Sequence, residues 1–151
     1  MTILTVQKFL DGGMPVSNDI RETEIETKIR SFEHFYLKPV LTPEVYADIL
    51  DNEGHAYDDV IYGTDTIAGL ELAIMHGVYA LMLYDTLRLT RYGSVRKESD
   101  ESASPGREDI LAVCKQNFEI CQVFVQEILD YLEIPKNKDY NSFIFNELTC
   151  L

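Results

Sequence analysis

The chain has 151 residues, 46% of them hydrophobic and 26% charged, and its formal net charge is −13 at pH 7. This length and composition fit one globular domain with its own core, and they exclude a disordered or collagen-like chain. The acidic balance argues against a protein whose whole surface grips nucleic acid or anionic membrane, because phosphate groups are bound by Lys and Arg.

The pattern predicts a first short helix over residues 4–10, closed by Gly12 and Gly13. No basic segment followed by a long apolar run stands at the start, so we expect no signal peptide. A second helix is predicted to begin at Asp19, with Glu22 completing a capping box. Its apolar positions share one face: Ile25, Ile29, Phe32 and Tyr36.

This second helix carries two favourable i,i+4 charge pairs, Glu26 with Arg30 and Glu24 with Lys28. We expect it to end before Pro39, because a residue that precedes proline avoids the helical conformation. The next helix is predicted to start with Thr42 as the N-cap and Pro43 in the first turn. A glycine-containing loop follows, from about residue 52 to 65.

Two long helices are predicted next, the first from Thr64 or Asp65 to about Leu89 and the second from Ser104 to about Leu132. The first is apolar on most sides, which indicates a central helix covered by several neighbours. The fold class is therefore all-α, a helical bundle with two long antiparallel helices joined by a long extended arm. We place the domain at 1–135, with the arm at about 90–104, and a C-terminal tail at 136–151.

The sequence contains no recognisable catalytic or metal-binding pattern. His34, His55 and His76 are scattered, and none has a partner at metal-ligand spacing. Cys114 and Cys121 lie on the apolar face of the second long helix, where core packing is the expected role of a reduced thiol. We therefore predict no enzyme and no catalytic, cofactor-binding or metal-binding residue.

The segment between the two long helices carries an unusual share of the positive charge. Residues 86–106, which include the end of the first long helix, hold four of the thirteen Lys and Arg residues, Arg88, Arg91, Arg96 and Lys97, and acidic residues follow at once. Connections between bundle helices usually take two to eight residues, and longer ones are commonly functional. Two interpretations stay open, a surface loop without a role and an arm that pairs with another chain.

The same segment resembles head–tail connector (adaptor) proteins of tailed bacteriophages, most closely those of crAss-like and other Bacteroidetes phages. These proteins share a T-R-aromatic-G-x-V-x-K connector followed by acidic residues and a serine, matched here by Thr90, Arg91, Tyr92, Gly93, Val95, Lys97 and Ser102. A second block, YLxPxLGxxLYxxLL, is matched by Tyr36, Leu37, Pro39, Leu41, Tyr46 and Leu50. Thr42-Pro43 stands where that family usually has a glycine. The resemblance runs over residues 19 to 133.

The resemblance implies a structural virion protein without catalysis or cofactor, made in the host bacterial cytoplasm. Copies would form a dodecameric ring in the phage neck that binds the portal, meets other neck or tail ring proteins and extends the DNA channel. Genomic DNA would pass through without specific binding, and no membrane would be involved. The expected subunit and portal contacts are Thr90, Arg91, Tyr92, Gly93, Ser94, Val95, Arg96, Lys97, Phe143, Ile144 and Phe145.

Three alternatives stay open. The chain could fill another neck role, as a head-closure or tail-interface ring. It could be a small acidic regulatory module that binds a host protein or mimics DNA, although several of its carboxylates are paired with Lys or Arg at i,i+4. The third alternative is an enzyme whose site has no familiar motif.

Overall fold

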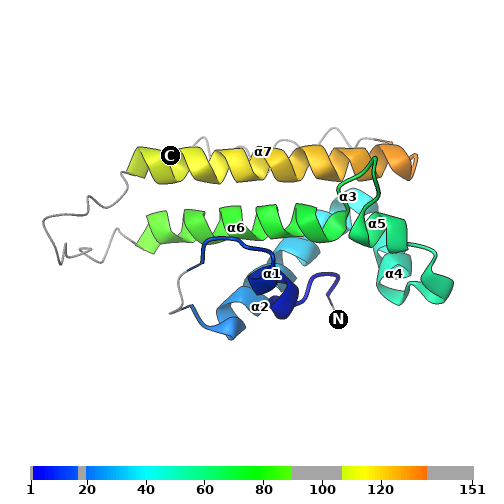
Figure 1. The fold of residues 1–151 in the computed structure, drawn as a ribbon, viewed down its shortest axis with the longest axis horizontal. Coiled ribbons are helices and arrows are strands. Elements are labelled where there is room, and N and C mark those ends of the chain that lie inside the picture. Colours follow the sequence, from blue (N-terminus) through cyan, green and yellow to red (C-terminus); the bar gives the residue numbers. More distant parts are fainter. Residues whose placement is uncertain (1, 17–19, 90–106, 136–151) are drawn as a thin grey trace, which may run out of the picture.

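The computed structural model describes residues 2–16, 20–89 and 107–135, and all of its regular elements in these ranges are helical (Figure 1). The all-α prediction is confirmed for this part of the chain. The elements, in order, are α1 (Val6–Asp11), α2 (Glu22–Phe32), the π-helical turn η1 (Glu33–Leu37), α3 (Lys38–Leu41), α4 (Pro43–Asp51), the 3-10 turn η2 (Glu53–His55), α5 (Asp58–Tyr62), α6 (Leu70–Leu89) and α7 (Arg107–Tyr131).

Helices α6 and α7 lie side by side and form the long axis of the molecule (Figure 1). Cys114 Sγ donates to the Ala80 carbonyl at 3.2 Å, and His76 Nδ1 lies 2.8 Å from Asn117 Oδ1. From the first contact to the second, the residue number falls in α6, from 80 to 76, and rises in α7, from 114 to 117. The two helices therefore run in opposite directions. The predicted apolar face of α7 is confirmed, because Cys114, Phe118, Cys121, Val125 and Ile128 are all buried.

Helices α1 and α2 cover another side of α6 (Figure 1). The predicted apolar stripe of α2 is confirmed, with Ile25, Ile29, Phe32 and Tyr36 all buried. Phe32 packs so tightly on Gly77 that a Cβ built on this glycine would lie 2.3 Å from two carbons of the Phe32 ring. The contact explains why α6 has a glycine in its interior despite the cost to helix stability.

The prediction that the second helix ends before Pro39 is wrong. The chain stays helical from Glu22 to Leu41, and the π-helical turn η1 ends two residues before the proline. The Lys38 N–H donates to the Glu33 carbonyl, five residues back. This wider turn changes the i→i−4 pattern with which a proline ring and its missing N–H would otherwise conflict.

Two predicted helix starts are also wrong. Helix α2 begins at Glu22 with Arg21 in the N-cap position, and Asp19, the predicted N-cap, lies outside the described residues. Helix α6 begins at Leu70, later than the predicted start at 64 or 65. The preceding loop brings Gly63 and Gly69 together at φ 86° and 84°, and a Cβ on Gly69 would lie 2.5 Å from the Gly63 nitrogen. Only glycine fits such a backbone crossing.

Candidate interaction surfaces

The residues predicted to contact other subunits, Thr90 to Lys97 and Phe143 to Phe145, lie outside the described residues, as do the whole arm and the whole tail. The structure does place the helix ends from which these segments start. Leu89 and Arg107, which flank the arm, lie at one end of the molecule, and α3, α4 and α5 gather at the opposite end (Figure 1). The arm therefore starts and ends at the tip of a helical hairpin.

The segment that leads to the tail begins with a tight reversal at the end of α7. The Ile134 N–H donates to the Leu129 carbonyl at 2.9 Å, and the Glu133 N–H donates to the Asp130 carbonyl at 3.2 Å. Glu133 has a φ of 56°. This combination is a Schellman motif, in which a left-handed residue turns the chain off the helix axis. Leu129 is buried, and Ile134 also packs against the core.

The two described cysteines are packing residues between α6 and α7. Both thiols are buried, and burial raises the pKa of Cys114 and of Cys121 above their usual range. A thiol with a raised pKa is a poor nucleophile at neutral pH, because only the thiolate reacts readily. This agrees with the packing role predicted from the spacing of the two residues.

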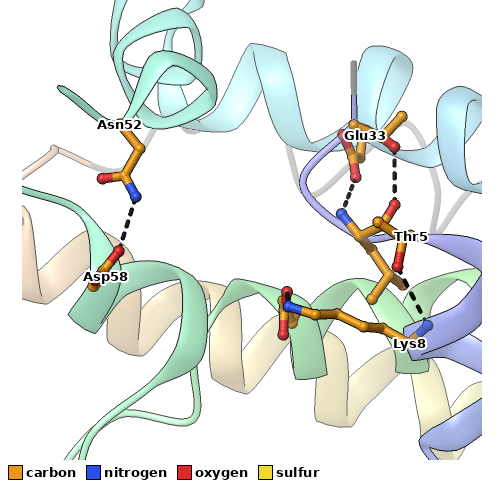
Figure 2. Close-up of polar contacts among 8 residues, drawn as sticks. Thr5, Lys8, Glu33, Asn52 and Asp58 are labelled. Atoms are coloured by element: carbon orange, nitrogen blue, oxygen red, sulfur yellow. Dashed lines mark hydrogen bonds and ion pairs between the residues drawn. The ribbon is translucent and has the colours of Figure 1, made fainter. Parts of the chain in front are cut away.

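Glu33 is the one charged residue found fully buried in the described part of the chain, at 1% exposure. Its carboxylate accepts hydrogen bonds from the backbone N–H groups of Ile3 and Leu4, both at 3.0 Å, and from the Tyr46 hydroxyl at 2.8 Å. Figure 2 shows Glu33 reaching from its helix to the N-terminal segment. One side chain thus ties η1, α4 and the N-terminal residues together.

Two opposing effects act on the buried carboxyl group of Glu33. Burial raises the pKa of Glu33 above its usual 4.5, while the hydrogen bonds from Leu4, Ile3 and Tyr46 act in the opposite direction. Burial and the hydrogen bond to Glu33 also raise the pKa of Tyr46. The three donors satisfy an acceptor that would be costly to bury alone.

The corner between α3 and α4 combines backbone strain with exposure. Thr42 stands in the predicted N-cap position with Pro43 in the first turn, but its φ is 69° and its ψ 146°, and its side chain makes no capping hydrogen bond. A β-branched residue is rarely found at positive φ. The Phe35 side chain, in the neighbouring π-helical turn, is 76% exposed. Strain and π-helical turns are both more frequent at functional sites than elsewhere.

Asn52 organises the turn between α4 and α5. Its backbone is left-handed, its Oδ1 accepts from the Tyr57 N–H at 2.9 Å, and its Nδ2 donates to Asp58 Oδ1 at 2.8 Å (Figure 2). Asparagine tolerates this conformation better than most residues, and its side chain here replaces missing backbone partners.

Two lysines attach the N-terminal helices to α6. Lys8 of α1 forms an ion pair with Glu71 and lies 4.6 Å from the centroid of the Tyr62 ring. Lys28 of α2 forms an ion pair with Asp85 instead of the predicted Glu24, whereas the predicted pair of Glu26 with Arg30 is confirmed at 2.7 Å.

One flank of the α6–α7 pair carries partly exposed apolar side chains in the described part of the chain. His76 contacts Asn117 and lies with its ring centroid 5.8 Å from that of Phe124. Helical spacing places Leu72 and Leu83 on the same side of α6 as His76, and Val113 and Ile120 on the same side of α7 as Phe124. All six side chains are half-buried or exposed: Leu72, His76, Leu83, Val113, Ile120 and Phe124. We call these residues the open flank.

The described ranges hold no cluster of three His, Cys, Asp or Glu side chains that could bind a metal ion. Within the same ranges, no helix has the length and apolarity needed to cross a membrane.

Sequence reasoning missed Glu33 and the strain at Thr42, although each leaves a signal. Glu33 stands four residues after Ile29, which puts a carboxylate directly on the apolar stripe of α2. Thr42 replaces the glycine that the resembling connector proteins usually have at this position. A glycine is what a φ of 69° favours.

Comparison with known proteins gives a family but not a function. No curated protein and no solved structure matches the chain. The model of a family of unknown function, DUF6712, matches residues 37–149, which include α3 to α7, the arm and nearly all of the tail. Since the match covers most of the sequence, the chain belongs to the DUF6712 family of unknown function.

Proposed function

We propose that this protein is a structural virion protein that forms a ring in the neck of a tailed bacteriophage. The ring joins the portal to the tail and extends the channel through which the DNA passes. The proposal starts from the resemblance of residues 90–102 and 36–50 to phage connector proteins. It assigns no catalytic step and no cofactor to the chain.

The observation that carries the proposal is the position of the two helix ends that flank the arm. The ends of α6 and α7 that flank residues 90–106 lie together at the far end of the molecule from α3, α4 and α5 (Figure 1). A segment that starts at the tip of a long helical hairpin is well placed to meet a second molecule. Its basic residues Arg91, Arg96 and Lys97 are opposite in charge to the body of an identical neighbour, since the chain is strongly acidic.

In this proposal two long antiparallel helices hold an extended arm, and Arg91, Tyr92, Arg96 and Lys97 contact a neighbouring subunit or the portal. Phe143, Ile144 and Phe145 bury against the domain or against another neck protein. Repeated around a closed ring, a net charge of −13 leaves few phosphate contacts for the DNA, so the channel does not hold it.

Native mass spectrometry of the protein mixed with the portal of the same phage tests the proposal. A portal complex that carries about twelve added copies supports it. If the protein does not bind the portal and electron microscopy finds no ring of it in the neck, the proposal fails.

The arm is tested separately by reversing two charges, in the variant R96E/K97E. We expect a folded monomer and weaker ring formation on the portal, because contact with an acidic neighbour becomes repulsive. The matched control is R21E/K115E, which makes the same change of charge on exposed side chains of the body. If both variants assemble like the parent protein, the arm does not make the contact.

A further inference from the structure

We infer that the C-terminal tail, residues 136–151, folds back over the open flank of its own chain and buries Phe143, Ile144 and Phe145 there. The contact selects one of the two burial sites proposed above for these residues, and because it lies within one chain it does not depend on the ring. The inference rests on the uncovered apolar surface of α6 and α7, on the reach and direction of the tail, and on the extent of the family match.

The open flank is a partly exposed apolar surface that would be stabilised by burial. Helix α6 is apolar on nearly all sides, which is typical of a helix enclosed by its neighbours. Its other side meets α2, where Ile74 and Val78 are fully buried. Leu72 and Leu83 of the open flank, by contrast, stay half-buried in the described structure. Full burial of an exposed side chain of this size gains roughly 1.5–3 kcal/mol, and a half-buried one gains part of that.

The tail has the residues to provide this cover. Phe143, Ile144 and Phe145 are three consecutive large apolar residues, and polar residues flank them on both sides. Left exposed to water, each of these three side chains would forgo roughly 1.5–3 kcal/mol of burial free energy. Contact between the two apolar surfaces removes both costs.

The tail is long enough to reach the flank within one chain. An extended chain spans about 3.3 Å per residue, so Phe143 can lie up to about 26 Å from Pro135. Ile120 lies only about 16 Å back along α7 from Tyr131, at about 1.5 Å of helical rise per residue. The difference of about 10 Å is comparable to the diameter of a helix, which allows the chain to pass around the end of α7.

The end of α7 directs the chain toward such a path. The Schellman motif at Glu133 and Ile134 ends the helical course of the chain, and Pro135 prevents the helix from continuing. The chain therefore leaves α7 in a reversal and does not run on along the helix axis.

The extent of the family match is a further argument. The match begins at residue 37 and runs to residue 149, so it leaves out α1 and α2 but includes α6, α7 and the tail. The open flank and the tail thus belong to the same family unit.

The flank also offers a polar contact at its centre. Asn117 Nδ2 donates to the Val113 carbonyl at 2.9 Å, so Asn117 Oδ1 accepts from the Nδ1–H of His76. The Nε2 atom of a neutral His76 ring is then a hydrogen-bond acceptor. Ser142 and Asn146, on either side of the apolar residues of the tail, carry suitable donors.

The test uses the full chain, which contains no tryptophan. A single tryptophan is introduced as Phe143→Trp, and its fluorescence reports whether this position is buried. Ile120→Gln and Leu72→Gln, each added to this background, make the flank polar from α7 and from α6 respectively. Val123→Gln is the matched control, because Val123 is 55% exposed on the outer side of α7. Circular dichroism verifies that each variant keeps its helices.

We expect emission at a shorter wavelength than in the urea-unfolded protein, unchanged on dilution. Ile120→Gln and Leu72→Gln should both move the emission to longer wavelength, and Val123→Gln should not. Emission equal to that of the unfolded chain overturns the inference, as does emission that neither flank variant changes. Emission that shifts on dilution also overturns it and assigns the flank to a second copy. The portal takes no part in this experiment, so its result is independent of the proposed ring.

Discussion

The two flanks of the α6–α7 pair are built from the same two helices and yet differ in how completely their apolar side chains are buried. On the covered flank, α2 and η1 pack Phe32 and Tyr36 against Gly77 and Phe118, and Glu33 ties the N-terminal residues to this layer. On the open flank, large apolar side chains lie half-buried around His76. The partner of the covered flank comes from the N-terminal part of the chain, and the partner that we infer for the open flank is the C-terminal tail.

The covered flank depends most on Glu33, so Glu33→Ala should have the largest effect. The substitution leaves the buried N–H groups of Ile3 and Leu4 without an acceptor and opens a cavity, and we expect the free energy of unfolding to fall by about 3 kcal/mol. Urea unfolding measures this change. Glu44→Ala, which removes the same charge from an exposed position of α4, is the control and should change stability by less than about 0.5 kcal/mol. Equal effects of the two substitutions would show that Glu33 is not a structural tie.

Gly77→Ala should destabilise the protein by overpacking the contact between α2 and α6. Alanine favours a helix interior over glycine by about 1 kcal/mol, but the added Cβ would lie 2.3 Å from the buried Phe32 ring. We expect a net loss of about 2 kcal/mol in unfolding free energy. Combining it with Phe32→Leu should restore part of this loss, because the smaller side chain makes room, and a double-mutant cycle measures the coupling. Strictly additive losses would contradict the proposed contact.

The raised pKa of Glu33 should make the free energy of unfolding depend on pH. Since burial raises the folded pKa above the usual 4.5, the folded state holds the proton more tightly than the unfolded state. The stabilisation that results is full below the unfolded pKa and is lost as the pH rises through the folded pKa, because the buried carboxyl then gives up its proton. Urea unfolding between pH 4 and pH 8 should therefore show the stability of the parent falling, relative to Glu33→Gln, as the pH rises. A constant difference would mean that Glu33 does not titrate differently in the two states.

The apolar periodicity of the sequence was enough to predict the longer helices, though not all of their starts, and much of the core, because burial follows residue type and spacing. The buried stripe of α2 and the apolar face of α7 are examples. The continuation of the helix through Pro39 could not be predicted, because it depends on a π-helical turn whose residues contact Phe118 and the N-terminal residues, which are distant in sequence. The role of Glu33 was hidden for the same reason, since its partners Ile3 and Leu4 are distant in sequence. The predicted interface residues all lie outside the described residues, so they stay predictions.

Thr42→Gly should stabilise the protein by relieving backbone strain at the corner between α3 and α4. A left-handed backbone costs a residue with a Cβ roughly 1–2 kcal/mol, whereas glycine adopts it freely but loses more conformational entropy on folding. We therefore expect a net gain of about 0.5–1 kcal/mol in thermal or urea unfolding. Asn52→Gly is the matched control, because Asn52 also has positive φ but its side chain bonds to Tyr57 and Asp58. That substitution should destabilise the protein, and a gain at Asn52 equal to that at Thr42 would show that backbone strain alone decides both positions.

The smallest expected effect comes from the ion pair of Lys28 with Asp85, which joins α2 to α6 near the edge of the covered flank. Both side chains are about one-third exposed, at 34% and 35%, so water screens the attraction and both residues lose side-chain entropy on pairing. Lys28→Gln should therefore lower the unfolding free energy by about 0.5 kcal/mol, and the difference should shrink as salt is added. Arg30→Gln removes a pair within α2 alone and should cost no more than this. A loss of several kcal/mol at Lys28 would mean that charge pairing, and not the apolar contact of Phe32 with Gly77, holds α2 on α6.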